Sequence, residues 1–267
     1  MLRAAGGLAL AGLSWGLFES QWIERRTVEV TLERLPPALD GLRVLHLSDL
    51  HLGSVSLNGR SLERAAAWAE TLDLDLVVVT GDLLARQRGE PRLMEALWRL
   101  RPRFGTFAVL GNVDVADTRD PFSTGAELST LAPHARLLAD ESVTLEVAGH
   151  TVQLVGCAVT SRYRPPAGLA EPDADLRILI AHFPDTVDRL RYGAFDLVLA
   201  GHTHDGQICV PYPGGKVRLA GHNPYPAGQF TLPQCMLVVS RGTGTTFVPF
   251  RFASRPEASV LVLRRRA

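Results

Sequence analysis

The residues best suited to chemistry in this 267-residue chain are aspartate, asparagine and histidine side chains that follow apolar stretches. They are Asp49 and His51 in "LSDLHLG", Asp82 in "VVTGD", Asn112 in "VLGN", His182 in "LIAH", and His202 and His204 in "LAGHTHDGQ". Imidazole, carboxylate and amide oxygen together suit Mn, Fe or Zn better than Ca or Mg. A lone Asp-x-His is more often a hydrogen-bonded pair, so a metal centre requires that these segments converge.

The elements before these residues indicate that they do converge. "RVLHLSD", "DLVVVTGD", "TFAVLGN", "RILIAH" and "FDLVLAGH" are continuous apolar runs, typical of strands covered on both faces. "SLERAAAWAETL" and "EPRLMEALWRL" lie between the first three and have helical spacing. Ligands of α/β sheets bind outside the carboxyl ends of the strands, so we expect the polar residues to meet there.

Local geometry suggests how the side chains could share ions. In an extended chain residues i and i+2 point to the same side, so we expect Asp49 and His51 to bind one ion, and His202 and His204 to share a centre. Glycine precedes three of the polar residues, at Gly81, Gly111 and Gly201. We expect these glycines to let the backbone turn tightly at the site.

Other segments predict a second kind of strand pairing. "SVTLEVAGHTVQLVG" is two alternating runs that read as a hairpin, and "TVEVTL", "CMLVVSRG" and "SVLVLRR" add further strands. The predicted fold class is therefore α/β, a layered sandwich of two mixed β-sheets flanked by helices. "GQICVPYPGGKVRLAGHNPYPAGQF" is rich in Gly and Pro and predicts a long structured loop. Its Tyr212, Tyr225 and Phe230 either form an apolar wall for a lipid or base or hold the loop down.

The N-terminus differs from the rest of the chain. Residues 4–18 are uncharged and precede the polar "ESQWIERR", so residues 1–20 predict an N-terminal apolar anchor or signal-like segment, with residues 27–267 as one folded domain. No clear cleavage site follows, which favours an uncleaved membrane anchor over a removed signal. A buried N-terminal helix is the alternative. We expect a membrane-associated protein, with the cytoplasmic face and export both open.

Composition narrows the partners. The 28 basic and 28 acidic residues cancel, so no overall field attracts nucleic acid, and no nucleic-acid partner is expected. Three scattered cysteines, Cys157, Cys209 and Cys235, predict buried small hydrophobes and neither a disulfide framework nor a zinc site. Any anion binding must therefore be local.

The polar motifs resemble the calcineurin-like metallophosphoesterase family, whose pattern is Asp-x-His, Gly-Asp, Gly-Asn-His-Asp/Glu, His and Gly-His-x-His. The resemblance extends over about residues 42–263. "LSDLHLG", "AHFPD", "GHTHDGQ" and "VSRGTGTTFVPFRFASRPEASV" are more narrowly similar to membrane-associated bacterial phosphodiesterases with an N-terminal apolar segment. The resemblance implies the calcineurin-like phosphoesterase fold and two divalent metal ions, of Mn, Fe or Zn.

The resemblance also implies a ligand set and a reaction. The first ion would be bound by Asp49, His51, Asp82 and His204. The second would be bound by Asp82, Asn112, His182 and His202. Asp82 would bridge the ions, and a hydroxide between them would attack phosphorus, because metal binding lowers the pKa of water from about 15.7 toward 7. Asp82, Asn112 and His202 are the expected catalytic residues, acting through the metals.

One motif departs from the family pattern. It reads "GNVD", with Val113 where the family has a histidine that assists the leaving group. General acid help is typically worth about 10²–10⁴-fold, so alkoxide leaving groups should react poorly. We expect a phosphorylated small molecule or lipid as substrate, with a phosphodiester or pyrophosphate bond, as in a lipid-linked or nucleotide-diphosphate-type compound. His222 is a candidate substitute acid, although a lone loop histidine is more often exposed.

Two competing interpretations remain open from the sequence. A catalytically weakened metal-binding scaffold or regulatory protein would explain Val113, although retention of every ligand position favours an enzyme. A mononuclear zinc hydrolase would use only Asp49, His51 and His204. Counting bound metals separates this second alternative from a two-metal enzyme.

The remaining polar residues near the motifs are expected to be structural. Asp114 would orient the missing histidine in relatives, and Asp205 is expected to be a turn residue. Arg241 and Arg251 could contact phosphate, although salt bridges are the commoner role for such arginines. Packing, turn or surface positions are expected for His46, His134 and His150.

Overall fold

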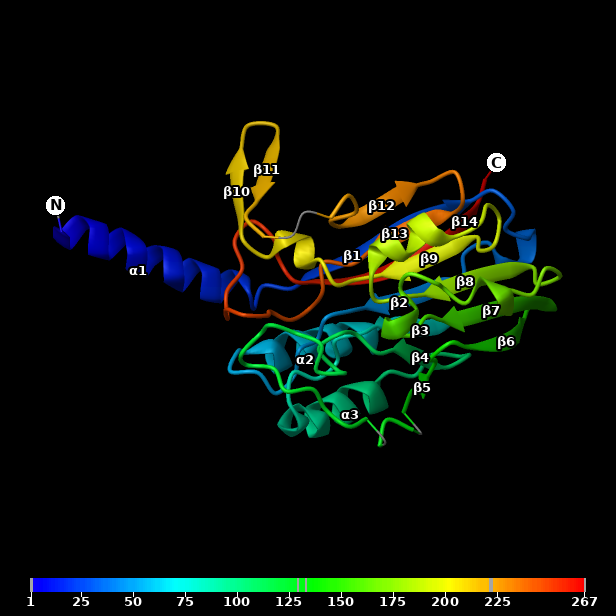
Figure 1. Ribbon diagram of the computed structural model, residues 1–267, viewed down its shortest axis with the longest axis horizontal. Helices are drawn as coiled ribbons and strands as arrows, with labels where there is room; N and C mark the ends of the chain where they lie inside the picture. Colours follow the sequence, from blue (N-terminus) through cyan, green and yellow to red (C-terminus); the bar gives the residue numbers. More distant parts are fainter. Residues whose placement is uncertain (1, 129, 133, 221–222, 267) are drawn as a thin grey trace.

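The computed structural model describes residues 2–128, 130–132, 134–220 and 223–266. Within these ranges the strands form two six-stranded sheets and a separate two-stranded hairpin. The two sheets pack face to face, and helices α2 and α3 cover the outer face of the first (Figure 1). Both sheets contain parallel and antiparallel pairs, so the predicted α/β sandwich of two mixed sheets is confirmed.

The two central strands of each sheet pair in parallel. The first sheet runs β1 (Glu24–Leu32), β14 (Glu257–Arg265), β2 (Arg43–Leu47), β3 (Leu76–Thr80), β4 (Thr106–Val109) and β5 (Arg136–Leu137). The second runs β12 (Gly228–Thr231), β13 (Met236–Val239), β9 (Leu197–Ala200), β8 (Leu176–Ile180), β7 (His150–Gly156) and β6 (Glu141–Val147). The separate hairpin is β10 (Cys209–Tyr212) and β11 (Gly215–Arg218).

The apolar strands of the first sheet lie between two apolar layers, and their side chains point alternately into one layer and the other. In β3, Leu76 and Val78 face the layer between the sheets, whereas Val77 and Val79 face the helices. Successive strand side chains point to opposite faces, so a strand that lies between two apolar layers needs apolar residues throughout. This is the physical reason for the continuous runs in the sequence.

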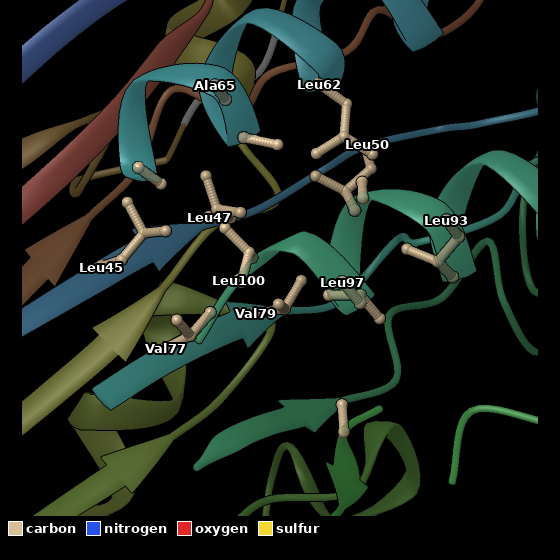
Figure 2. Packing of buried hydrophobic residues seen from close by; sticks show 14 of the residues in the cluster. Leu45, Leu47, Leu50, Leu62, Ala65, Val77, Val79, Leu93, Leu97 and Leu100 are labelled. Atoms are coloured by element: carbon tan, nitrogen blue, oxygen red, sulfur yellow. The ribbon is translucent and has the colours of Figure 1, made fainter. Parts of the chain in front are cut away.

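Helices α2 (Asn58–Ala69) and α3 (Glu90–Arg99) close the helical side of the first sheet. Figure 2 shows apolar side chains of these helices facing the sheet side, with Leu62 beside Leu50 and Leu97 beside Val79. Their predicted helical spacing is therefore confirmed. This rigid packing supports the carboxyl ends of β2 and β3, from which candidate site residues extend.

The Gly- and Pro-rich segment is more ordered than the predicted loop. It contains the hairpin β10–β11 and the edge strand β12, which the sequence did not reveal because turns at Pro and Gly dominate its composition. Tyr225 and Phe230 pack edge to face, 5.3 Å apart, against the outer face of the second sheet. These two aromatic residues hold the segment down, whereas Tyr212 lies on the hairpin and is exposed.

The predicted apolar N-terminal segment forms the helix α1 (Leu2–Glu19), which extends away from the body (Figure 1). None of the helices within the described ranges combines the length and apolar character that crossing a membrane requires. The end of α1 contacts the body, since Glu19 Oε1 accepts a hydrogen bond of 2.8 Å from the Ser254 amide. Strand β1 then begins at Glu24, before the predicted strand at Thr27.

Candidate metal centre

The candidate ligands converge at one edge of the sandwich, as the strand ends predicted. Those from the first sheet follow β2, β3 and β4, and those from the second follow β8 and β9. Their donor atoms fall into two compact groups, Asp49, His51, His204 and Asp82, His182, His202, with all atoms of each group within 4.8 Å of one another. Asn112 adjoins the second group, with its Oδ1 atom 3.0 Å from His182 Nε2.

The first group is closed to solvent. Asp49 is fully buried, and the exposed fractions of His51 and His204 are only 1% and 4%. The Nε2 atoms of the two histidines face each other at 3.0 Å, and His204 Nε2 lies 3.4 Å from Asp49 Oδ1. Three lone-pair donors that face one buried point form a donor set that fits a divalent transition-metal ion.

The second group is oriented by its hydrogen bonds. His182 Nδ1 donates to the Thr80 carbonyl at 2.8 Å, so its Nε2 faces the centre. Asn112 Nδ2 donates to the Asp117 carbonyl at 2.9 Å, so its Oδ1 faces the centre too. His202 Nδ1 lies 3.1 Å from His182 Nε2. These donors also fit a metal ion.

Asp82 connects the two groups. Its Oδ2 atom lies 3.4 Å from His51 Nε2 and 3.5 Å from His182 Nε2. Its Oδ1 atom accepts a 2.8 Å hydrogen bond from the backbone amide of Val113, which fixes the carboxylate. The backbone at position 113 therefore has a positioning role that does not depend on the side chain there.

The backbone conformation corrects the expected i, i+2 geometry. Strand β2 ends at Leu47, and Asp49 and His51 both have positive φ, at 51° and 44°, so neither lies in an extended chain. His202 and His204 also have positive φ, at 70° and 49°, and belong to different groups. The turn between His202 and His204 separates their side chains, so each belongs to a different ligand group. Non-glycine residues with positive φ cost roughly 1–3 kcal/mol each and concentrate at functional sites.

The glycines act differently from one another. Gly81 has φ of 90°, as expected of a tight turn, but Gly111 and Gly201 do not have left-handed backbones. Instead, a Cβ on Gly111 would overlap Asp82 Oδ1, and one on Gly201 would overlap Ser48 Oγ. At these two positions glycine permits close approach of neighbouring chain segments and not a turn.

Burial and charge set the protonation of the histidines in the metal-free protein. Burial lowers the pKa of His51 to about 4 and that of His202 to about 4, so both are neutral at pH 7 and have a lone pair for a metal. Burial also acts to lower the pKa of His182, but the Asp82 carboxylate outweighs it and raises that pKa to about 9. A metal that binds His182 must therefore displace a proton.

The two buried carboxylates stay ionised beside these rings. Burial acts to raise the pKa of Asp49, but the surrounding histidines, His204 foremost, bring it well below its usual range. The same balance, with His182 as the main partner, lowers the pKa of Asp82. Two ionised carboxylates within one cluster of imidazoles give the centre the charge that attracts divalent cations.

A cavity of about 590 Å³ opens over the centre, and its lining includes His51 and His204 of the first group and Asp82 and His202 of the second. His202, Asn112 and Val113 lie in its lining, together with Arg162. Sequence analysis missed Arg162, because "TSRYR" carries no motif signal. Its Nε donates to Asp185 Oδ1 at 3.0 Å, and its guanidinium stacks 4.0 Å above the Phe183 ring. Phe183 in turn lies 4.5 Å from the His202 ring, so the arginine is held close to the centre.

The arginines and aspartates predicted to be structural form fixed networks. Arg251 is fully buried and donates to the Gly244 carbonyl at 3.0 Å and the Ser254 carbonyl at 3.0 Å, so it is not placed to contact phosphate. Arg241 pairs with Glu24 at 2.9 Å. Asp205 has φ of 53° and is indeed a turn residue, and it also accepts three cationic partners, from Lys216, Arg218 and Arg241.

Asp114 lies under the site rather than in it. Its Oδ1 accepts from the Leu84 amide at 2.9 Å, and its Oδ2 accepts from the Gly111 amide at 2.8 Å. Burial, reinforced by the Asp82 charge, raises the pKa of Asp114 to about 7. It therefore holds the turns that carry Asp82 and Asn112.

Two histidines outside the centre have the packing and surface roles that we expected. His46 is buried, with Nε2 3.0 Å from Thr80 Oγ1. His150 lies 3.3 Å from Asp175 near the surface. The candidate acid His222 lies outside the described residues. Cys157, Cys209 and Cys235 are buried free thiols, as expected.

Comparison with known proteins identifies relatives that are named as metallophosphoesterases or as a pyrophosphatase. An uncharacterised metallophosphoesterase of Bacillus subtilis is 27% identical over 89% of each chain. A transmembrane protein with a metallophosphoesterase domain from Danio rerio is 31% identical over 89% of this chain, which spans 56% of that protein. A UDP-2,3-diacylglucosamine pyrophosphatase of Chlamydia trachomatis is 28% identical over 84% of each chain.

A sequence model of a protein family also matches the chain. It describes the calcineurin-like phosphoesterases and covers residues 42–206. The match includes each candidate ligand from Asp49 to His204, and these are the residues that the fold brings together. The chain therefore belongs to the calcineurin-like phosphoesterase family and is a metal-dependent phosphoester hydrolase.

Proposed function

We propose that this hydrolase uses two metal ions and cleaves phosphodiester or pyrophosphate bonds. One ion would be held by Asp49, His51, Asp82 and His204. The other would be held by Asp82, Asn112, His182 and His202. The observation that carries this proposal is the position of Asp82 Oδ2, 3.4 Å from one histidine group and 3.5 Å from the other. A single carboxylate between two nitrogen-rich groups is suited to bridging two ions.

The metal pair would supply the main chemistry. Two divalent ions lower the pKa of water and stabilise charge on phosphoryl oxygens, and the mixed nitrogen and oxygen donors favour Mn, Fe or Zn. The chain's own contribution is positioning: the Val113 amide holds Asp82, and the Thr80 carbonyl holds His182. His202 is held by its own amide, which donates to both Asp49 oxygens, at 3.1 and 3.0 Å.

The cavity favours a substrate whose leaving group is a weak base. Val113 lines the cavity where a proton donor would otherwise lie, and its side chain cannot donate a proton. Arg162 supplies a permanent positive charge in the same lining, and guanidinium binds phosphate oxygens well. A pyrophosphate bond fits both features, because it expels a phosphate and presents two phosphoryl groups. The Chlamydia relative, named as a pyrophosphatase, supports a diphosphate substrate joined to a lipid.

Membrane attachment through residues 1–20 is part of this proposal. Trp15 and Phe18 are 50% and 55% exposed, and with Trp22 they form a cluster whose ring centroids lie 5.6 to 6.5 Å apart. Exposed tryptophan and phenylalanine side chains favour the membrane interface. Flotation of the full chain with phospholipid vesicles tests the attachment, and a chain that stays at the bottom of the gradient would contradict it.

The decisive experiment compares two nitrophenyl substrates with the full chain and Mn²⁺. We expect hydrolysis of bis(p-nitrophenyl) phosphate to exceed that of p-nitrophenyl phosphate, and both to disappear in Asp82→Asn. Nitrophenolate leaves without acid help, so Val113 does not limit either rate. Asp188→Asn is the matched control, because this exposed carboxylate bonds only Tyr225 among the described residues.

Metal analysis of the same samples makes the result specific. Two ions per wild-type chain and fewer in Asp82→Asn are expected. One ion per active chain would support the mononuclear alternative instead. A folded chain with two ions and no activity on either substrate would support the scaffold interpretation, and a faster monoester reaction would rule out a diesterase.

A further inference from the structure

The hairpin β10–β11 projects from the body at the end of the molecule from which α1 also extends (Figure 1). Its register places Val210 opposite Val217 and Tyr212 opposite Gly215. Directly opposite residues of an antiparallel pair lie on the same face, so Val210, Val217 and Tyr212 share one face of the hairpin. Ile208 and Leu219 continue that face toward the body, joined by the 2.9 Å bond from the Leu219 amide to the Ile208 carbonyl.

This apolar face is open to solvent. The exposed fractions are 50% for Val210, 54% for Val217, 55% for Tyr212 and 61% for Leu219. A two-stranded hairpin is marginally stable by itself in water, and contiguous exposed apolar residues usually mark a binding surface. The face therefore needs a partner that is itself apolar.

The opposite face fixes the orientation of the hairpin. Lys216 and Arg218 are on that face, and both form ion pairs with the buried Asp205, beside the candidate ligand His204. Lys216 Nζ also donates to the Ala253 carbonyl at 2.7 Å. The sequence from 207 to 220 contains no acidic residue, so nothing in it repels an anionic ligand. The apolar face is thus held in a fixed direction relative to the metal centre.

The apolar face is continuous with the catalytic cavity. Ile208 and Leu219 line the cavity together with the candidate ligands His51 and His202. Phe247 and Val248 line the cavity as well, and Phe247 is 49% exposed. A path of apolar side chains therefore begins in the cavity and continues outward along the hairpin to Tyr212. At about 3.4 Å per residue, the strand from Ile208 to Tyr212 spans roughly 14 Å, the length of a medium hydrocarbon chain.

We propose that the apolar face of hairpin β10–β11 binds the hydrocarbon part of an amphiphilic phosphoester, whose phosphate lies at the metal centre. This inference rests on the proposed function and makes it more specific, because it places the lipid part of the substrate on named residues. It also separates substrate binding from membrane attachment, which we place in residues 1–20.

Direct binding provides the first test. Octylphosphonate and methylphosphonate have the same head group and are not hydrolysed. Calorimetry on the full chain should show tighter binding of octylphosphonate, by about tenfold if two methylenes are buried, with a more negative heat-capacity change. V210T/V217T keeps the β-branched shape and should remove most of this gain, without changing the affinity for methylphosphonate. Equal affinities of the wild type for the two phosphonates would overturn the proposal.

A matched substitution controls for the loss of an exposed apolar residue. Tyr212→Ser should weaken octylphosphonate binding, whereas Tyr192→Ser should not, because Tyr192 is 84% exposed and lies outside the catalytic cavity. If octylphosphonate still binds more tightly than methylphosphonate, by the wild-type factor, in both V210T/V217T and Tyr212→Ser, the proposal is overturned. Reduced flotation with phospholipid vesicles in V210T/V217T, with unchanged octylphosphonate binding, would also overturn it and make the hairpin a bilayer contact.

Kinetics then separate this inference from the proposed function. Octyl and methyl p-nitrophenyl phosphate share a reaction centre and a leaving group, so a higher kcat/KM for the octyl ester reports its tail alone. V210T/V217T should reduce kcat/KM for the octyl ester about fivefold or more through KM, and leave the methyl ester unchanged. No hydrolysis of the methyl ester would contradict the proposed function. Hydrolysis of both esters at equal kcat/KM would contradict only the hairpin.

Discussion

The two ligand groups contain similar side chains but lie in different surroundings. Asp49, His51 and His204 are enclosed, and Arg251 lies behind them with its Nη2 3.1 Å from His204 Nδ1. Both groups have members in the cavity lining, but only the second has half-buried side chains there, at His202 and the adjoining Asn112. If each group binds an ion, as we propose, the more closed group would retain its ion and the more open group would meet the substrate.

Chemical rescue would test this division most strongly. His51→Ala and His202→Ala should each lose more activity than the roughly 100-fold typical of losing an outer partner of a ligand. Added imidazole should restore more activity to His202→Ala, where the ring is half-buried in the cavity lining, than to His51→Ala, where the exposed fraction is 1%. Rates on bis(p-nitrophenyl) phosphate at rising imidazole concentration provide the measurement.

The size of the added base is the control for that experiment. 2-Methylimidazole is too bulky to coordinate well and should rescue neither variant, and imidazole should not accelerate the wild type. Equal rescue of the two variants would show that both groups are equally open to solvent, and would contradict the proposed difference between them.

A smaller effect is expected from restoring a proton donor on the open side. Val113→His should accelerate esters with alkoxide leaving groups by about 10²-fold, the lower end of general acid help. Nitrophenyl esters should change little, so the dependence of rate on leaving-group pKa should become shallower. Val113→Gln is the control, since it is polar and cannot act as a general acid. An unchanged dependence would mean that position 113 does not face the leaving group.

The smallest effect concerns His46, which is fully buried with its Nε2 3.0 Å from Thr80 Oγ1. Burial lowers the pKa of His46 to about 4, below its ordinary value of 6.5, so the unfolded chain binds more protons between these values. Its contribution to stability is present above pH 6.5 and is lost as pH falls toward 4. His46→Leu should reduce the slope of unfolding free energy against pH in this window, by up to about 1.4 kcal/mol per pH unit.

Urea unfolding at several pH values, on protein from which a chelator has removed the metal, measures that slope. His150→Leu is the control, because this histidine lies near the surface beside Asp175. A slope that His46→Leu leaves unchanged would show that His46 is not the group that must remain neutral.

Much of this centre could be predicted from the sequence, for a physical reason. Continuous apolar runs predict parallel strands, and neighbouring parallel strands bring their carboxyl ends to one edge, so Asp82 and Asn112, which follow β3 and β4, could be placed together. The division into two groups came from the family resemblance. The i, i+2 spacing predicted correctly that Asp49 and His51 lie in one group, but for the wrong reason. It assumed an extended backbone, which their positive φ excludes.

Features that depend on packing could not be predicted in the same way. Arg162 reaches the centre only through its stacking on Phe183 and its pairing with Asp185, and neither contact leaves a pattern in the sequence. The hairpin β10–β11 was hidden because Pro and Gly fill its turn. The roles of Gly111 and Gly201 depend on which segments pass beside them, which is a tertiary property.

The position of β14 has a consequence for how the protein is made. This strand lies between β1 and β2, and the segment before it braces the centre, since the Thr243 amide donates to Ser48 and the Gly244 amide to Asp49. During synthesis, Asp49 and His51 leave the ribosome long before residues 242–265, so the pocket for the first ion stays incomplete until then. We therefore expect the first ion to bind stably only after translation, and a chain stalled near residue 240 to carry exposed sheet edges and no finished centre.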